Sequence, residues 1–264
     1  MEDSVAGYQK ELDLARTLAR EAGLAALRRR GSGIVFESKS DESPVTAADR
    51  ESERIITAGI DAAFPADGVL GEEGAAKESR SGRLWIIDPI DGTRDFIRNN
   101  LTWAVLIGLE DSASGEVIAG VAHFPALDRT YVATLGGGAF LNDAPIRISP
   151  IDSIAQAVVN IGGFNNMARH GFAARIPEWI APFWAFRSMG GCLDAMMVAS
   201  GQAEIWIEPG GKAWDFAPLK LIATEAGARF LNFNGASSIY GGNAIIAVPP
   251  LAAEALRFVG GSGR

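Results

Sequence analysis

From about Val5 to Arg30, apolar residues recur every three or four positions, which is the spacing of one face of a helix. Basic residues and a Gly-Ser-Gly turn follow, so the pattern predicts a long amphipathic helix that ends there. A second helix is predicted to run from Thr46, its N-cap, to Phe64. Residues 39–46 are polar and rich in turn formers, and we expect them to form a loop between the two helices.

Short apolar runs predict strands in the middle of the chain. Val69-Leu70 and Leu84–Ile87 each lead directly into acidic residues, as buried strands that end in turns do. Between Leu101 and Ile148, apolar runs alternate with turns rich in Gly, Pro and Ser. This pattern predicts an antiparallel meander with strands over residues 103–109, 117–124 and 130–135.

Predicted strands and helices alternate in the second half of the chain. Strands are expected over residues 157–160, 203–208, 229–233 and 244–248, and helices over 189–200, 214–226 and 251–259. Such alternation indicates helices packed on a sheet, so the fold class is α/β with α+β character. The pattern changes near Pro150. It predicts an N-terminal lobe over residues 1–150 and a C-terminal lobe over 151–264.

Composition excludes several classes of protein. With 48% hydrophobic and 21% charged residues, the chain has material for a real core. A net charge of −8 argues against a nucleic-acid partner, and the lone Cys192 is expected to be a small buried residue without a disulfide. The sequence has no signal-peptide pattern and no run of about 18 apolar residues. We therefore expect a cytoplasmic protein without a membrane partner.

Candidate chemistry begins at the end of the strand Leu84–Ile87. Asp88 would lie at the end of that strand, and Pro89 would stiffen the turn that carries Asp91. Two carboxylates so close together repel each other unless a cation lies between them. Mg²⁺ prefers oxygen ligands, so this turn is a candidate metal site. The alternative is an ordinary turn, because Asp-Pro and Asp-Gly pairs are common in turns without chemistry.

A phosphate site would fit directly beside this metal site. Gly92 allows the backbone to approach a ligand closely. If Thr93 opens a helix, the amides of Gly92 and Thr93 point outward and can bind a phosphate.

Two further acidic residues stand at the ends of predicted elements. Glu72 follows the strand at Val69-Leu70, and Asp215 stands at the start of a predicted helix. Each also has a structural interpretation, Glu72 as a loop residue and Asp215 as an N-cap. Asp49 likewise suits position N3 of its helix on structural grounds alone. Their conjunction with the Asp88–Thr93 stretch favours a shared site beyond the strand ends.

Taken together, these motifs resemble the inositol monophosphatase family. The resemblance rests on Gly71-Glu72-Glu73, on Asp88-Pro-Ile-Asp-Gly-Thr93 and on Trp214-Asp215 with Glu225-Ala-Gly227. The stretch Lys39-x-Asp-x-Ser-Pro-Val-Thr-x-x-Asp49 also matches, and the likeness covers roughly Leu12 to Val248. It implies a layered αβαβα sandwich, a Mg²⁺-dependent phosphomonoesterase, sensitivity to Li⁺ and a homodimer.

The resemblance also implies roles for single residues. Two or three Mg²⁺ ions would be bound by the carboxylates of Glu72, Asp88, Asp91 and Asp215 and by the carbonyl of Ile90. Phosphate would be bound by Gly92, Thr93 and Lys39. Catalysis would fall to Glu72 and to Thr93 paired with Asp49, which would orient the attacking water. Glu208 matches the position that contacts the alcohol part of the substrate.

The resemblance also implies a small phosphate monoester as the substrate, but the chain departs from the commonest inositol phosphatase pattern. Arg94-Asp95 stands where many members have a neutral pair, and Trp103–Ile107 and Glu208-Pro209 resemble the histidinol-phosphatase branch. Trp103 itself is expected in the core. The first substrate expected is myo-inositol 1-phosphate, followed by L-histidinol phosphate, and then by fructose 1,6-bisphosphate or a 3′-phosphoadenosine nucleotide. A binding module without turnover and a calcium-binding structural protein are the alternatives that are not enzymes.

Overall fold

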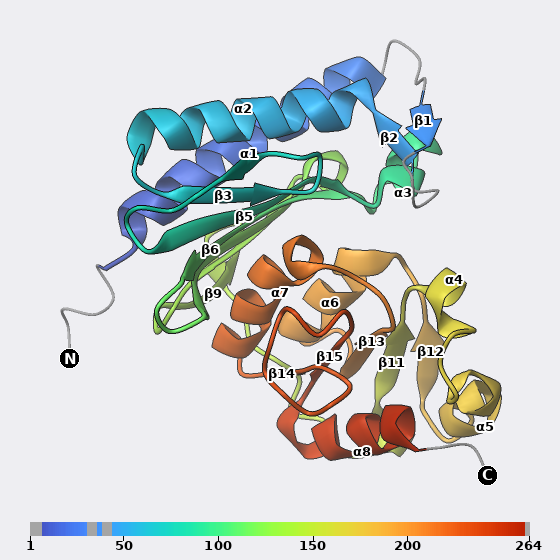
Figure 1. Ribbon diagram of the computed structural model, residues 1–264. Coiled ribbons are helices and arrows are strands. Elements are labelled where there is room, and N and C mark those ends of the chain that lie inside the picture. Colours follow the sequence, from blue (N-terminus) through green and yellow to red (C-terminus); the bar gives the residue numbers. More distant parts are fainter. Residues whose placement is uncertain (1–6, 31–35, 39–43, 262–264) are drawn as a thin grey trace.

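Helices and sheets stack in the order helix, sheet, helix, sheet, helix (Figure 1). The computed structural model describes residues 7–30, 36–38 and 44–261. Helices α1 (Gln9–Arg30) and α2 (Ala47–Ala63) form one outer layer, and α6 (Gly191–Ala199) and α7 (Ala213–Glu225) form the middle layer. Helix α8 (Pro249–Gly260) covers the far face of the second sheet. The layered αβαβα sandwich expected from the family resemblance is thus confirmed.

The first sheet has eight strands in the order β10-β9-β8-β7-β6-β5-β3-β4. Their bounds are β3 Gly68–Gly71, β4 Ala76–Lys77, β5 Arg83–Asp91, β6 Ala104–Asp111, β7 Glu116–Phe124, β8 Arg129–Thr134, β9 Gly138–Leu141 and β10 Ala144–Pro145. Strands β6, β7 and β8 pair antiparallel, which confirms the predicted meander. Strand β3 pairs with β5 in parallel, so both strands end at the same edge of the sheet.

The predicted end of β5 at Asp88 is wrong. The strand continues to Asp91, because Asp88 pairs with Leu106 and Asp91 pairs with Ala104 of β6. Three steps along β5 therefore match two steps along β6, which is the geometry of a β-bulge. A bulge, rather than a free turn, bends the strand end that carries both aspartates.

The second sheet has five strands in the order β12-β11-β13-β15-β14. Their bounds are β11 Val158–Ile161, β12 Ala185–Arg187, β13 Ile205–Glu208, β14 Arg229–Leu231 and β15 Ala244–Ala247, close to the predicted positions except for β12. Residues 162–187, which show no readable pattern, contain the short helices α4 (Phe164–Met167), η3 (Ala173–Arg175) and α5 (Ile176–Ile180) before β12. The remaining short helices are α3 (Thr93–Ile97), η1 (Pro125–Leu127) and η2 (Ile154–Gln156).

The entry to α2 confirms the predicted N-cap. The Thr46 hydroxyl accepts hydrogen bonds from the backbone of Ala48 and Asp49, and the Asp49 carboxylate accepts one from the Thr46 backbone N–H. This reciprocal pair is a capping box. Just before it, β1 (Phe36–Ser38) pairs with β2 (Pro44–Thr46), so the last residues of the predicted loop form a strand instead.

Side-chain alternation divides the apolar residues among three cores. On β5, Trp85 and Ile87 face α1 and α2, whereas Ile86 belongs to the core that surrounds α6 and α7. On β13, Trp206 faces this middle layer, and Ile205 and Ile207 pack in the third core with α8. Because alternate residues share a face, Asp88 and Glu208 continue the faces that look toward the middle layer.

Helix α7 lies very close to the first sheet. A Cβ atom at Gly108 of β6 would lie 2.8 Å from Cβ of Ala217, and one at Gly120 of β7 would lie 3.1 Å from Cα of Pro218. Glycines at these positions let the helix backbone approach the strands. The first turn of α7, which carries Asp215, is therefore held close to the end of β5.

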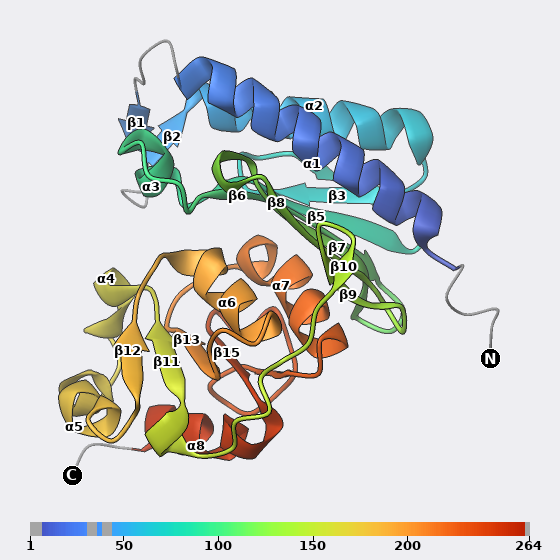
Figure 2. The same ribbon diagram turned by 180° about the vertical axis from the view of Figure 1, so that it is seen from behind.

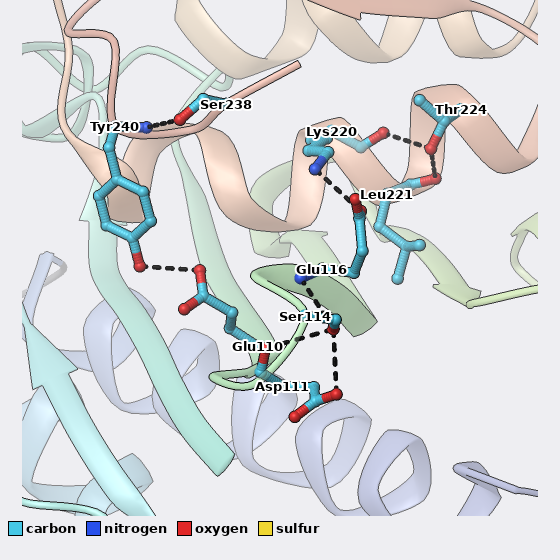
Figure 3. A network of polar contacts seen from close by, with 9 residues as sticks. All are labelled: Glu110, Asp111, Ser114, Glu116, Lys220, Leu221, Thr224, Ser238 and Tyr240. Atoms are coloured by element: carbon cyan, nitrogen blue, oxygen red, sulfur yellow. Dashed lines mark hydrogen bonds and ion pairs between the residues drawn. The ribbon is translucent and has the colours of Figure 1, made fainter. Parts of the chain in front are cut away.

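Polar contacts also connect the two halves, as Figure 3 shows. The Tyr240 hydroxyl donates to Glu110 of β6 at 2.7 Å, and Nζ of the buried Lys220 donates to Glu116 of β7 at 3.0 Å. In the reverse view the β6–β8 meander runs between α1 and the middle layer (Figure 2). Among the described residues, no helix is both long and apolar enough to cross a membrane.

His123 of β7 is buried beneath α1. Its Nδ1 lies 2.9 Å from the Thr130 hydroxyl oxygen. Burial, with help from the nearby Arg20 charge, lowers the pKa of His123 from 6.5 to about 4. Between about pH 4 and pH 6.5, His123 of the unfolded chain therefore binds a proton more readily than His123 of the folded protein does.

We predict that acid destabilises the protein partly through His123. As the pH falls from about 7 to about 4.5, this group removes about 2–3 kcal/mol from the free energy of unfolding. Urea unfolding of the wild type and of His123→Gln at the two pH values measures this difference. The variant should lose less stability than the wild type on acidification; an equal loss would contradict the prediction.

Candidate active site

Three aspartates converge where β5 and α7 meet. Asp88 and Asp91 come from the bulged end of β5, and Asp215 comes from the first turn of α7. One carboxylate oxygen from each lies within 4.8 Å of the other two. Asp88 is 1% exposed, and Asp91 and Asp215 are half-buried. The structure thus brings together residues separated by more than a hundred positions.

Glu72 joins this cluster from the neighbouring strand. Its backbone N–H donates to the Ile87 carbonyl at 3.1 Å, which continues the parallel pairing of β3 with β5. Glu72 lies outside the group of three aspartates, but burial raises the pKa of Asp88, and the charge of Glu72 and its hydrogen bond with Asp88 raise it further. The four acidic residues predicted from the sequence therefore lie in one region.

Local hydrogen bonds fix the orientation of each aspartate. The Asp88 Oδ1 accepts from the Ile90 backbone N–H at 3.0 Å, and this contact closes the bulge across Pro89. The Asp91 Oδ2 accepts from the Cys192 backbone N–H at 3.4 Å. Asp215 is not the N-cap of α7 but its third residue, and its Oδ2 accepts from the Lys212 N–H at 2.6 Å.

Electrostatics make this cluster costly without a cation. Burial raises the pKa of Asp88 well above its ordinary value, and the charges of Glu72, Asp91 and Asp215 raise it further. Burial likewise raises the pKa of Asp91 and of Asp215. Oxygen ligands at this spacing suit a hard divalent cation, which would replace the repulsion by attraction. The donor set therefore fits Mg²⁺ and contains neither the histidine nor the thiolate ligands typical of zinc.

The segment after Asp91 forms the predicted turn into a helix. Gly92 has φ 84°, a left-handed conformation that glycine adopts readily, and it is the N-cap of α3. The first helical hydrogen bond runs from Phe96 N–H to the Gly92 carbonyl at 3.0 Å. The amides of Gly92 and Thr93 precede this bond, at the end of the helix where an anion can be bound.

Thr93 and Asp49 lie in contact beside the aspartates. The Thr93 hydroxyl is 3.4 Å from Asp49 Oδ1 and 3.2 Å from the Ile90 carbonyl oxygen, so it can donate to either. Asp49 is fully buried, and its Oδ2 accepts from the Thr46 backbone and hydroxyl. Burial raises the pKa of Asp49, although the Thr46 hydrogen bonds oppose this shift. Asp49 therefore has both a capping contact and a contact to the site.

Of the two remaining predicted site residues, the structure describes Glu208 but not Lys39. Glu208 ends β13 on the side of the middle layer, and burial raises its pKa well above the ordinary value. A Cβ at Gly162 or Gly163 would overlap the Glu208 carboxylate, so these glycines make room for it. Lys39 lies outside the described residues.

The sequence analysis did not identify the start of α6 as part of the site. The buried Asp194 carboxylate accepts from the backbone N–H groups of Met189 and Gly190, at 3.0 to 3.2 Å. These bonds hold the turn whose Gly191 and Cys192 lie against Asp91. Cys192 is buried, as expected, but beside the aspartates. One signal was present, since Asp194 is the only charged residue in the apolar run of α6.

The expectation that Trp103 lies in the core is confirmed, and His170 and Asp95 make structural contacts. Trp103 is fully buried and packs edge-on against Phe96 at 5.0 Å between ring centroids. His170 stacks on Phe172, and its Nε2 lies 2.8 Å from the Pro209 carbonyl oxygen. Asp95, in the unusual Arg94-Asp95 pair, accepts from the Asn100 side chain at 2.9 Å.

Comparisons with known proteins show what the whole chain is similar to. The model of the inositol monophosphatase family matches residues 8–259. A histidinol-phosphatase of Chlorobaculum parvum is 37% identical and covers 89% of this chain and 91% of its own. An inositol-1-monophosphatase of Rhizobium meliloti is 34% identical, with coverages of 92% and 90%. The solved structure of the Thermotoga maritima IMPase TM1415 has a TM-score of 0.84 at 30% identity, with coverages of 95% and 96%.

The fold, the acidic site and these relatives define a phosphatase, that is, a phosphoric monoester hydrolase. The chain belongs to the inositol monophosphatase family.

We predict that Asp88→Asn stabilises the protein when EDTA removes metal. The substitution keeps the acceptor for Ile90 N–H but removes one buried charge from the cluster, which should raise the free energy of unfolding by about 1–3 kcal/mol. Urea unfolding with EDTA and with Mg²⁺ tests this. The wild type should gain stability from Mg²⁺, whereas the variant should gain much less. A less stable variant in EDTA would contradict the repulsion argument.

Proposed function

We propose that this protein hydrolyses a small phosphate monoester with Mg²⁺ ions bound at Glu72, Asp88, Asp91 and Asp215. The convergence of the three aspartates within 4.8 Å, next to a helix start that can bind phosphate, is the observation that carries the proposal. Bound Mg²⁺ supplies positive charge that offsets the phosphate dianion and stabilises the leaving alcohol oxygen. The Ile90 carbonyl is a further candidate ligand, although its oxygen also lies within hydrogen-bond distance of the Thr93 hydroxyl.

The residues of the chain would orient the reaction. The amides of Gly92 and Thr93 would donate to phosphate oxygens. A Thr93 hydroxyl that donates to Asp49 keeps lone pairs free to accept a hydrogen bond from a water molecule. With Glu72 nearby, that water would attack phosphorus and lose one proton, the P–O bond to the alcohol would break, and the leaving oxygen would take up one proton, so that alcohol and inorganic phosphate result. Lys39 remains a candidate phosphate contact from its sequence position.

We infer L-histidinol phosphate as the first substrate to test, with myo-inositol 1-phosphate second, the reverse of the order expected from the sequence. The Chlorobaculum relative named histidinol-phosphatase supports this order, as do Trp103–Ile107 and Glu208-Pro209. The Glu208 carboxylate is also chemically suited to a substrate amine as well as to hydroxyls. The inositol-1-monophosphatase relative keeps the second candidate open. A homodimer stays part of the proposal from the family resemblance.

We predict metal-dependent release of phosphate from an aryl phosphate. Turnover should require Mg²⁺, stop on addition of EDTA, and fall at least about a thousandfold in Asp88→Asn, because a buried ligand charge is lost. Phosphate release is measured directly. Asp143→Asn, which removes only the exposed ion pair with Arg16, is the control and should retain wild-type turnover.

Turnover of Asp88→Asn at the wild-type rate, or full activity in EDTA, would contradict the proposed function. The same assay with histidinol phosphate, inositol 1-phosphate and sugar phosphates, compared by kcat/KM, ranks the substrates. A protein that binds Mg²⁺ but releases no phosphate from any of them would be a binding module instead.

A further inference from the structure

Glu53 is a buried carboxylate near the site that has no assigned role. It lies on α2, 6% exposed, one helical turn after Asp49. Its Oε2 accepts from the Glu73 backbone N–H at 2.8 Å, and its Oε1 accepts from the Ala75 backbone N–H at 2.9 Å. Both donors belong to the turn directly after Glu72.

This turn holds Glu72 from several sides. The Gly71 N–H donates to the Ala75 carbonyl at 2.7 Å, and the Glu72 N–H donates to Ile87 of β5 at 3.1 Å. A side chain at Gly71 would overlap the Glu53 carboxylate, so Gly71 is the residue that lets the turn approach α2. Glu53 thus supplies the contact between the turn and helix α2.

The two backbone N–H groups that donate to Glu53 suit a negatively charged carboxylate. Amide N–H groups bind an ionised carboxylate more strongly than a neutral acceptor, and the low dielectric of a buried site strengthens the contact. Residues four positions apart share one face of a helix, so Asp49 and Glu53 point to the same side of α2. One rigid helix therefore supports both the Asp49–Thr93 pair and the turn that carries Glu72.

We propose that Glu53 is a positioning residue that orients Glu72 for metal binding through the backbone of residues 73–75. This inference depends on the proposed function, in which Glu72 is a ligand of Mg²⁺. Residues that orient metal ligands typically change affinity about 10- to 100-fold when they are replaced. Glu53 would act without touching the metal or the substrate.

The variants Glu53→Gln and Glu53→Ala test the proposal in the full chain. Glu53→Gln removes the charge and one acceptor, and Glu53→Ala removes both acceptors. Titration calorimetry with Mg²⁺ should show about tenfold weaker binding or more, with the larger loss in Glu53→Ala. Amide hydrogen exchange of the metal-free protein should become faster at Glu73 and Ala75. If Glu53→Ala does not fold, Glu53→Gln and Gly71→Ala, which displaces the same carboxylate, carry the test.

Glu225→Gln is the matched control. Glu225 of α7 accepts from the backbone N–H groups of Gly136 and Gly138, each at 2.8 Å, in the β8–β9 turn. It therefore makes the same kind of double contact, but it stands ten residues and about 15 Å along α7 from Asp215. This variant should lose comparable stability and keep wild-type Mg²⁺ affinity. Equal weakening of Mg²⁺ binding in Glu225→Gln and Glu53→Gln would overturn the proposal.

Glu72→Gln separates this inference from the proposed function. If Glu72→Gln leaves Mg²⁺ affinity unchanged, Glu72 is not a ligand and both the ligand set and the role of Glu53 are wrong. If Glu72→Gln weakens binding but Glu53→Gln, Glu53→Ala and Gly71→Ala do not, only the inference about Glu53 is wrong. Weakened binding in Glu72→Gln and in the Glu53 variants, with Glu225→Gln unchanged, supports it.

Discussion

Repulsion among the carboxylates of the acidic cluster is the main physical constraint on this protein. Asp88, Asp91 and Asp215 bring their oxygens within 4.8 Å, and burial raises the pKa of each. A fold gains nothing in stability from such a cluster without a cation. A divalent cation would convert the same three charges into ligands, and its binding would explain the arrangement.

The layers can be understood as the means of building that cluster. The parallel pair β3 and β5 brings Glu72 beside Asp88, and the bulge turns Asp91 toward the middle layer. Close packing of α7 on the glycines of β6 and β7 brings Asp215 to the same place. The three aspartates come from the ends of regular elements, and Glu72 comes from the turn directly after β3, so rigid backbone determines most of the geometry.

Local sequence patterns predicted many of the helices, strands and turns. The parts of the fold and the site that were not predicted depend on contacts between residues distant in sequence. The capping box at Thr46, the meander and the helix starting at Thr93 follow from spacing and turn residues. The end of β5 was misplaced because a Pro/Asp/Gly cluster signals a turn, whereas pairing with β6 continues past it as a bulge. Residues 162–187 form short helices without periodicity. The contacts of Glu53 to backbone amides leave no pattern in the sequence, and those of Asp194 leave only a single charged residue in an apolar run.

Metal binding by the acidic cluster is tested most directly by a crystal structure of the protein grown with Mn²⁺. Carboxylate ligands bind Mn²⁺ as they bind Mg²⁺, and Mn²⁺ scatters anomalously. An anomalous peak is expected among the carboxylate oxygens of Asp88, Asp91 and Asp215, with Glu72 at the same centre. Carboxylates that stay close together with no peak between them, or a peak elsewhere in the molecule, would contradict it.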